Sequence, residues 1–169
     1  MSQARADFGN RPAVTPAWTS PARKRRARAS DSPQSSAGLA KDAEATFEAG
    51  LKKFPTDAMH RQAYGVLLAR MAESGEATAG RAVKMLESAL AVEPSLAEAH
   101  YQLGSLALAG NDAASAVLHF EAAASNGLDE SRLHYATARA LRRLGKMDDS
   151  ARHMDLFRQR KQSEESPGV

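Results

Sequence analysis

The sequence predicts an all-α fold, a right-handed helical-repeat solenoid of about three and a half helix pairs. The dipeptide His100-Tyr101 recurs 34 residues later as His134-Tyr135. Three further columns share this spacing: Ala82, Ala116 and Ser150; Leu86, Phe120 and Met154; Ala89, Ala123 and Phe157. Within one period, apolar residues at helical spacing form two amphipathic segments separated by Gly110-Asn111-Asp112. Independent columns with one common period indicate stacked helix pairs.

Composition supports helices and excludes several kinds of site. Hydrophobic residues make up 43% of the 169 residues, but alanine, the strongest helix former, dominates them and aromatic residues reach only 5%. The chain has no cysteine, which excludes disulfides and thiolate metal sites. No apolar run approaches the roughly 18 residues of a membrane span, and no secretory signal is evident at the N-terminus. We therefore expect a soluble intracellular protein, cytoplasmic or nuclear.

Residues 1–38 differ in composition from the rest of the chain. They contain four prolines, and seven basic residues against two acidic ones. Such a segment buries too little apolar surface to fold, so we expect disordered tails here and over residues 163–169. The basic run consists of Arg23, Lys24, Arg25, Arg26 and Arg28. A run of this kind attracts nucleic acid or acts as a nuclear import signal, although a solvated, nonspecific tail is the simpler interpretation.

The repeat domain is expected over residues 39–162. Its predicted helices are 39–53, 57–73, 79–92, 96–109, 113–125, 130–143 and 147–161. Ser95 with Glu98 forms a capping-box pattern, and Asp112 and Asp129 are predicted N-caps.

One unit of this domain, with Leu103-Gly104, Ala116, Phe120 and Ala123, resembles the tetratricopeptide repeat (TPR). That family has a 34-residue unit with Leu-Gly in its first helix and Ala, an aromatic residue and Ala in its second. The resemblance implies that Gly104 and Ala116 face each other across a tight helix crossing and that Phe120 fills the remaining gap.

The neighbouring units depart from the TPR pattern in different ways. The preceding unit has Tyr64-Gly65 and matches after an insertion around residues 73–80. The last unit is degenerate, with Ala138, Ser150 and Met154 at the glycine, alanine and aromatic positions. The first helix, which contains Phe47, resembles the second half of a unit whose first half is missing.

The TPR resemblance implies that the first helices of the units line a concave, partner-binding surface. The candidate binding residues are Gln62, Val66, Tyr101, Ser105, Tyr135, Arg139 and Arg142. Two tyrosines one unit apart, beside arginines, suit an extended acidic or C-terminal peptide segment; alternatively, the tyrosines pack and the arginines are solvated. Some TPR proteins hold the terminal carboxylate of heat-shock chaperones with Lys, Asn and Arg side chains on successive first helices. At the matching positions of this sequence only Arg139 fits that set, so this mode of binding is disfavoured.

The histidines are candidate metal ligands, but a packing or surface role is the stronger interpretation. His100, His119, His134 and His153 recur at the 34-residue period, and no motif groups three ligands. No serine nucleophile elbow, phosphate-binding glycine loop or paired carboxylates are evident. We therefore expect no catalytic residue, metal or cofactor.

These observations favour a non-catalytic adaptor that captures a segment of a partner protein. Two alternatives stay open: a nucleic-acid-associated or nuclear adaptor that uses the basic tail, and an interaction fragment of a longer protein. Because the first half-unit is missing, Leu39 and Phe47 are expected on an exposed apolar stripe. This stripe predicts self-association through residues 39–53, or coverage by another partner.

Overall fold

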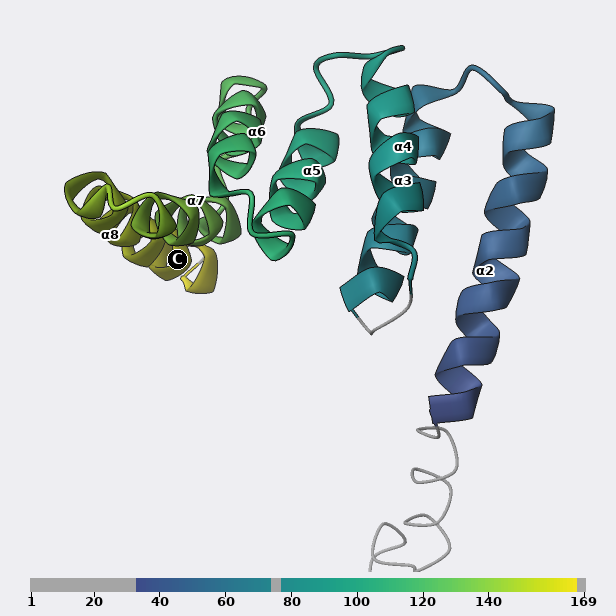
Figure 1. Cartoon of the computed structure of the whole chain (residues 1–169), viewed down its shortest axis with the longest axis horizontal. Coiled ribbons are helices and arrows are strands. Elements are labelled where there is room, and N and C mark those ends of the chain that lie inside the picture. The colour runs from purple at the N-terminus through teal and green to yellow at the C-terminus, as the bar shows by residue number, and fades with distance from the viewer. Residues whose placement is uncertain (1–32, 74–76, 167–169) are drawn as a thin grey trace, which may run out of the picture. The chain divides into compact units, whose positions relative to one another are not determined.

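The computed structural model describes residues 33–73 and 77–166. Within these ranges it consists of seven α-helices and contains no strand (Figure 1). The helices are α2 (Pro33–Lys53), α3 (Ala58–Glu73), α4 (Ala79–Leu90), α5 (Ala97–Ala109), α6 (Ala113–Ser125), α7 (Ser131–Arg143) and α8 (Met147–Glu165). None of these helices is long and apolar enough to cross a membrane. The chain divides into two units, residues 1–41 and 42–169, and the packing described below belongs to the second.

The helices of the second unit form the predicted repeat. Helices α3 and α4, α5 and α6, and α7 and α8 pack as three pairs, and each second helix also contacts the first helix of the next pair. The first helices contact one another in sequence, α3 with α5 and α5 with α7. These contacts confirm the all-α solenoid and place α3, α5 and α7 along one surface.

The tight crossing predicted for the second pair is present. A Cβ atom added at Gly104 would lie 2.6 Å from the Phe120 ring and 3.1 Å from the carbonyl oxygen of Ala116. At Gly65 in the preceding pair, a Cβ atom would lie 2.7 Å from the Leu86 side chain. Glycine is required at both crossings because any side chain would meet a buried residue of the second helix.

Two helices extend beyond their predicted ends. Helix α2 begins at Pro33, so the expectation of disorder over residues 33–38 is wrong; proline suits a first turn, where its missing N–H needs no partner. Helix α8 continues to Glu165, so disorder over 163–165 is also wrong. The reason lies in Glu164, whose carboxylate accepts hydrogen bonds from the backbone N–H and the hydroxyl of Ser131, at 2.8 and 2.6 Å. Residues 1–32, which include the basic run, and residues 167–169 lie outside the described part.

The expectation that Phe47 is exposed is wrong. Its ring is half-buried and stacks on the ring of Tyr64 in α3, with centroids 5.6 Å apart and planes inclined by 9°. The Tyr64 hydroxyl lies 3.2 Å from the carboxylates of both Glu44 and Glu48 of α2, between which its single proton is shared, and burial raises the pKa of Tyr64 to about 12. Arg81 of α4 completes this network by pairing with Glu44. Phe47 thus gives no support to self-association through residues 39–53, which stays a prediction, and the side chain of Leu39 lies outside the description.

Only one of the three predicted caps forms as expected. The Asp112 carboxylate accepts a hydrogen bond from the backbone N–H of Ser115 at 3.0 Å, which confirms this N-cap. The Ser95 prediction is wrong because the Ser95 hydroxyl donates to Glu93 instead and α5 begins at Ala97. The Asp129 prediction is also wrong, since Glu130 precedes α7 and the Asp129 carboxylate contacts His134 and Arg160.

Candidate binding groove

A groove of about 370 Å³ lies along α5 and α7, on the surface formed by the first helices. Its lining includes four of the seven predicted binding residues, Tyr101, Ser105, Tyr135 and Arg139. Helical spacing explains this arrangement, because positions four residues apart on α5 and on α7 lie on one face of each helix. The other charged residues of its lining are Arg132 and Arg143 of α7 and Glu73 at the end of α3.

The two tyrosines of the groove differ in their surroundings. Tyr101 is half-buried; its ring packs against Phe120, with centroids 5.9 Å apart, and the Arg132 guanidinium lies 4.5 Å from its centroid. The Tyr135 side chain is 45% exposed and packs on Phe157 of α8, with ring centroids 5.4 Å apart. Tyr101 therefore belongs partly to the core, whereas Tyr135 offers an accessible aromatic surface.

The arginines of the groove differ in a similar way. Arg132 donates two hydrogen bonds to the Glu98 carboxylate, at 2.6 and 3.2 Å, and a third to Glu130 at 2.6 Å. The hydrogen bonds to Glu98 raise the pKa of Arg132 above its usual value. The exposed Arg139 guanidinium lies 5.8 Å from the Tyr135 ring centroid, and no ion pair involves it within residues 33–73 and 77–166. Arg139 therefore presents its donors to a ligand, while Arg132 is already occupied.

The other three predicted residues lie elsewhere. Arg142 is exposed beside a smaller hollow of about 110 Å³ that Tyr135 and Arg139 also line. Val66 packs against the apolar cluster between α4 and α5. Gln62 is half-buried, and its buried Oε1 atom has no hydrogen-bond partner in the described part of the chain. The groove is thus lined mainly by α5 and α7, with Glu73 as the one lining residue from α3, and neither Gln62 nor Val66 lines it.

An apolar hollow of about 340 Å³ between α7 and α8 shares Arg132 and Tyr135 with the groove. The second aromatic residue of this hollow is Phe157, which sequence reasoning did not identify as a binding residue. The Lys161 ammonium lies 5.9 Å from the centroid of its ring. A signal was available, because Phe157 replaces an alanine of the 34-residue column. Together the two hollows provide apolar surface next to cationic groups.

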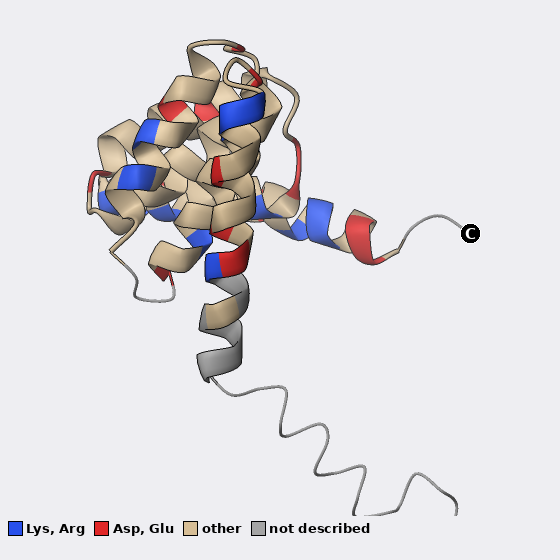
Figure 2. Cartoon of the chain, turned by 90° about the vertical axis from the view of Figure 1, so that its right-hand side faces the viewer, with Lys and Arg blue, Asp and Glu red and all other residues tan. Residues whose placement is uncertain are grey.

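Charge is distributed unevenly between the helices of the groove. Helices α5 and α6 contain no Lys or Arg, whereas α7 contains four Arg and no Asp or Glu. Helix α8, which leads to the C-terminus in Figure 2, carries both signs. The arginines of α7 therefore give its side of the groove a positive character that favours anionic groups.

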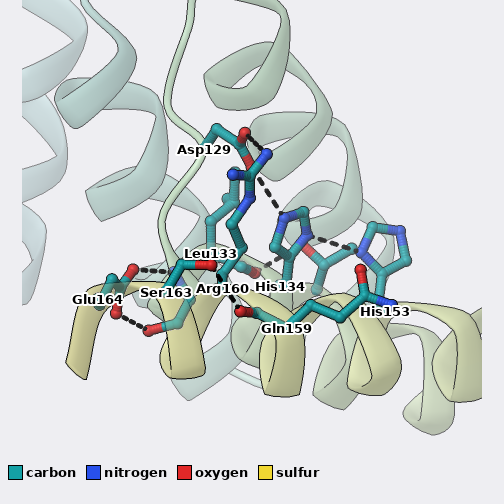
Figure 3. A network of polar contacts seen from close by, with 10 residues as sticks. Asp129, Leu133, His134, His153, Gln159, Arg160, Ser163 and Glu164 are labelled. Atoms are coloured by element: carbon teal, nitrogen blue, oxygen red, sulfur yellow. Dashed lines mark hydrogen bonds and ion pairs between the residues drawn. The ribbon is translucent and has the colours of Figure 1, made fainter. Parts of the chain in front are cut away.

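The four repeated histidines form two direct pairs away from the groove. The Nδ1 atoms of His100 and His119 are 3.3 Å apart. Those of His134 and His153, the pair drawn in Figure 3, are 3.4 Å apart. Sequence reasoning found the recurrence of these residues but not their contact. No group of three His, Cys, Asp or Glu that suits a metal ion occurs among the described residues.

Comparison with solved structures supports the fold. A crystal structure of MamA has a TM-score of 0.65 at 18% identity, and the match covers 78% of this chain and 74% of the MamA chain. MamA from Desulfovibrio magneticus RS-1, from residue 41 to its end, has a TM-score of 0.64 at 20% identity, covering 76% of this chain and 70% of its own. YrrB is described as a TPR protein with an unusual peptide-binding site. It has a TM-score of 0.63 at 20% identity, and the match covers 69% of this chain and 58% of YrrB.

The sequence itself matches no protein-family model and no curated protein. Identities at this level establish a shared architecture alone. The chain therefore has the fold of TPR solenoids, in agreement with the resemblance of its residues to that repeat.

Proposed function

We propose that this protein is a non-catalytic adaptor that binds an extended segment of a partner protein in the groove along α5 and α7. The observation that carries the proposal is the convergence of Tyr101, Ser105, Tyr135 and Arg139 on one groove, with Tyr135 and Arg139 accessible. The described peptide-binding site of YrrB, a protein of the same fold, gives further support.

The groove favours an acidic segment with an apolar side chain. Arg139 offers a forked set of donors that suits a carboxylate, and the Tyr135 ring beside it offers rigid contact area. A bulky apolar side chain of the partner would lie on Tyr135 and Phe157. Arg132 keeps its pairing with Glu98 and orders the wall of the groove.

The test uses peptides selected from a random display library on the full chain. Fluorescence anisotropy then measures their affinity for the wild type and for a Tyr135→Ala/Arg139→Ala variant. We expect affinity to fall at least about tenfold, because two accessible contacts of the interface centre are removed. Tyr101 is left unchanged because its ring packs against Phe120 in the core.

Matched controls lie outside the groove. Leu118→Ala on α6 and Arg158→Ala on α8 alter side chains that are 67% and 68% exposed. Both control variants should bind the peptides as the wild type does. Equal binding by the groove variant and the wild type would refute the groove as the site.

A second candidate function rests on the basic run of residues 23–28, which the structure does not describe. Electrostatic association with nucleic acid predicts binding to unrelated duplexes that weakens steeply with salt. Deletion of residues 1–38 should abolish that binding and leave peptide binding intact. Salt-independent binding, or binding that survives the deletion, would exclude the basic run as its source.

A further inference from the structure

Each of the last two helix pairs contains one histidine pair at the same place. His100 of α5 meets His119 of α6, and His134 of α7 meets His153 of α8. The ring centroids are 5.6 Å apart in both, and the two Nδ1 nitrogens lie within hydrogen-bond distance of each other, at 3.3 and 3.4 Å. The geometry therefore occurs twice, 34 residues apart.

The outer nitrogens of each pair determine how the protons are arranged. The Nε2 atom of His100 lies 3.2 Å from the carbonyl oxygen of Pro94, and that of His134 lies 3.2 Å from the Asp129 carboxylate (Figure 3). Both partners can only accept, so both Nε2 atoms carry hydrogen. In neutral His100 and His134 the Nδ1 atom is then an acceptor. His119 and His153 must donate from Nδ1, which requires the less common tautomer.

This arrangement tolerates only one added proton in each pair. A first proton leaves one Nδ1 atom as donor and the other as acceptor. A second proton places an N–H group on both Nδ1 atoms, so that two donors and two positive charges face each other. The hydrogen bond between the two imidazoles is then lost and replaced by repulsion.

The surrounding charges do not remove this conflict. Burial, and then the charge of His100, hold the pKa of His119 below its usual value, against the attraction of Glu87 of α4. Burial and His134 lower the pKa of His153 in the same way, against Asp149 of α8 and Glu121 of α6. Asp129, beside His134, is shared with Arg160. Lys146 and Arg152 line the hollow next to His153 and oppose a further positive charge.

We propose that the two histidine pairs are pH-sensitive contacts, and that protonation of both imidazoles of a pair loosens α5 from α6 and α7 from α8 in mildly acidic solution. Because α5 and α7 line the groove, the same change would alter the binding surface. The inference itself concerns the helix pairs and does not depend on a ligand.

The pair α3–α4 lacks this sensitivity. Arg61 stands where the other pairs have His100 and His134, and Met85 stands where they have His119 and His153. Arg61 donates to the carbonyl oxygen of Ser88 at 3.0 Å, a contact that no physiological pH change alters. Acidification should therefore loosen the last two pairs before α3–α4.

The direction of the effect follows from proton binding. The lowered pKa values of His119 and His153 mean that the unfolded chain binds these protons more readily than the folded protein. The contribution of these histidines to the free energy of unfolding is therefore fully present above about pH 6.5, the pKa of histidine in the unfolded chain. It decreases as the pH falls below that value.

The first test is 15N NMR of the imidazole rings of the full chain above about pH 8, where the histidines are neutral. We expect the Nδ1–H tautomer for His119 and His153 and the Nε2–H tautomer for His100 and His134. The Nε2–H tautomer for all four would overturn the proposal, and this result does not depend on any variant folding correctly.

The second test measures the melting temperature between about pH 8 and pH 5. In a His119→Asn/His153→Asn variant, the asparagine amide nitrogen lies near the Nδ1 position and donates without titrating. We expect its acid-induced fall in melting temperature to be roughly half that of the wild type or less. The control is His60→Gln, which keeps a donor for the Phe47 carbonyl and involves no histidine pair. A fall in the asparagine variant equal to that in the wild type and the control would overturn the proposal.

Discussion

The pairs α5–α6 and α7–α8 contain the same helix crossing with different side chains. In α5–α6 the crossing consists of Gly104 against the rigid ring of Phe120, which is 1% exposed. In α7–α8 the corresponding residues are Ala138, a methyl group larger, and Met154, a flexible side chain that is half-buried. The difference shows that glycine is required where a bulky, fully buried side chain faces it, as Phe120 faces Gly104 and Leu86 faces Gly65, whereas an alanine fits opposite the half-buried Met154.

Ser150 adds a second difference between the two crossings. It occupies the column of Ala116, is buried, and donates a hydrogen bond from its hydroxyl to the carbonyl oxygen of Ala138 at 2.8 Å. Packing of an aromatic ring is thus replaced by a polar contact between the helices. The last unit looks degenerate in sequence because three positions have changed together.

The largest expected difference between the two crossings is at the aromatic position. Phe120→Ala should lower the free energy of unfolding by about 3–5 kcal/mol, because it leaves a cavity in the buried core. Met154→Ala should cost roughly half as much or less, because the side chain is only half-buried. Urea denaturation of both variants measures the two values, and equal losses would contradict the contrast.

The next difference concerns the small residues. Gly104→Leu should destabilise the protein by about 1–3 kcal/mol through overpacking against Phe120. Gly104→Ala should also destabilise it, although alanine favours helices, whereas Ala138→Gly should cost about 1 kcal/mol through helix propensity alone. A Gly104→Ala variant that is more stable than the wild type would show that the α5–α6 crossing is looser than described.

A smaller effect is expected at Ser150. Ser150→Ala should lower the free energy of unfolding by about 0.5–1.5 kcal/mol, because one buried hydrogen bond is lost while the methyl-sized side chain still fits. Thermal or urea denaturation measures it. No change in stability would mean that the Ser150 hydroxyl contributes nothing to the pairing of α7 with α8.

The smallest effects concern the helix N-termini. Hydrogen bonds from Ser115 hold the pKa of Asp112 below its usual value. The Asp112 carboxylate therefore stabilises the folded protein at neutral pH, and this stabilisation is lost in acid as the carboxylate is protonated. Asp112→Asn keeps a good N-cap but removes this titration. Its melting temperature should match that of the wild type near neutral pH and fall less steeply below about pH 4. Parallel acid curves for the two proteins would contradict this assignment.

Sequence reasoning predicted the helices and the α5–α6 crossing because both depend on local pattern and on a period that repeats. It placed Gly104 and Phe120 correctly, since their column matches the TPR pattern. It missed the end of α8 and the contacts of Asp129, because these depend on Glu164 and Arg160, more than thirty residues away in the chain. It also treated Tyr101 and Tyr135 as equivalent, since their repeat position does not show how deeply each is buried.

The central claim, that the groove along α5 and α7 binds a partner segment, is tested most directly by NMR chemical-shift mapping. Display-selected peptide is added to the 15N-labelled full chain. We expect the largest amide shifts from Tyr101 to Leu108 and from Tyr135 to Arg143, and we expect them to disappear in the Tyr135→Ala/Arg139→Ala variant. Shifts concentrated around Leu118 on α6, or shifts that persist in that variant, would contradict it.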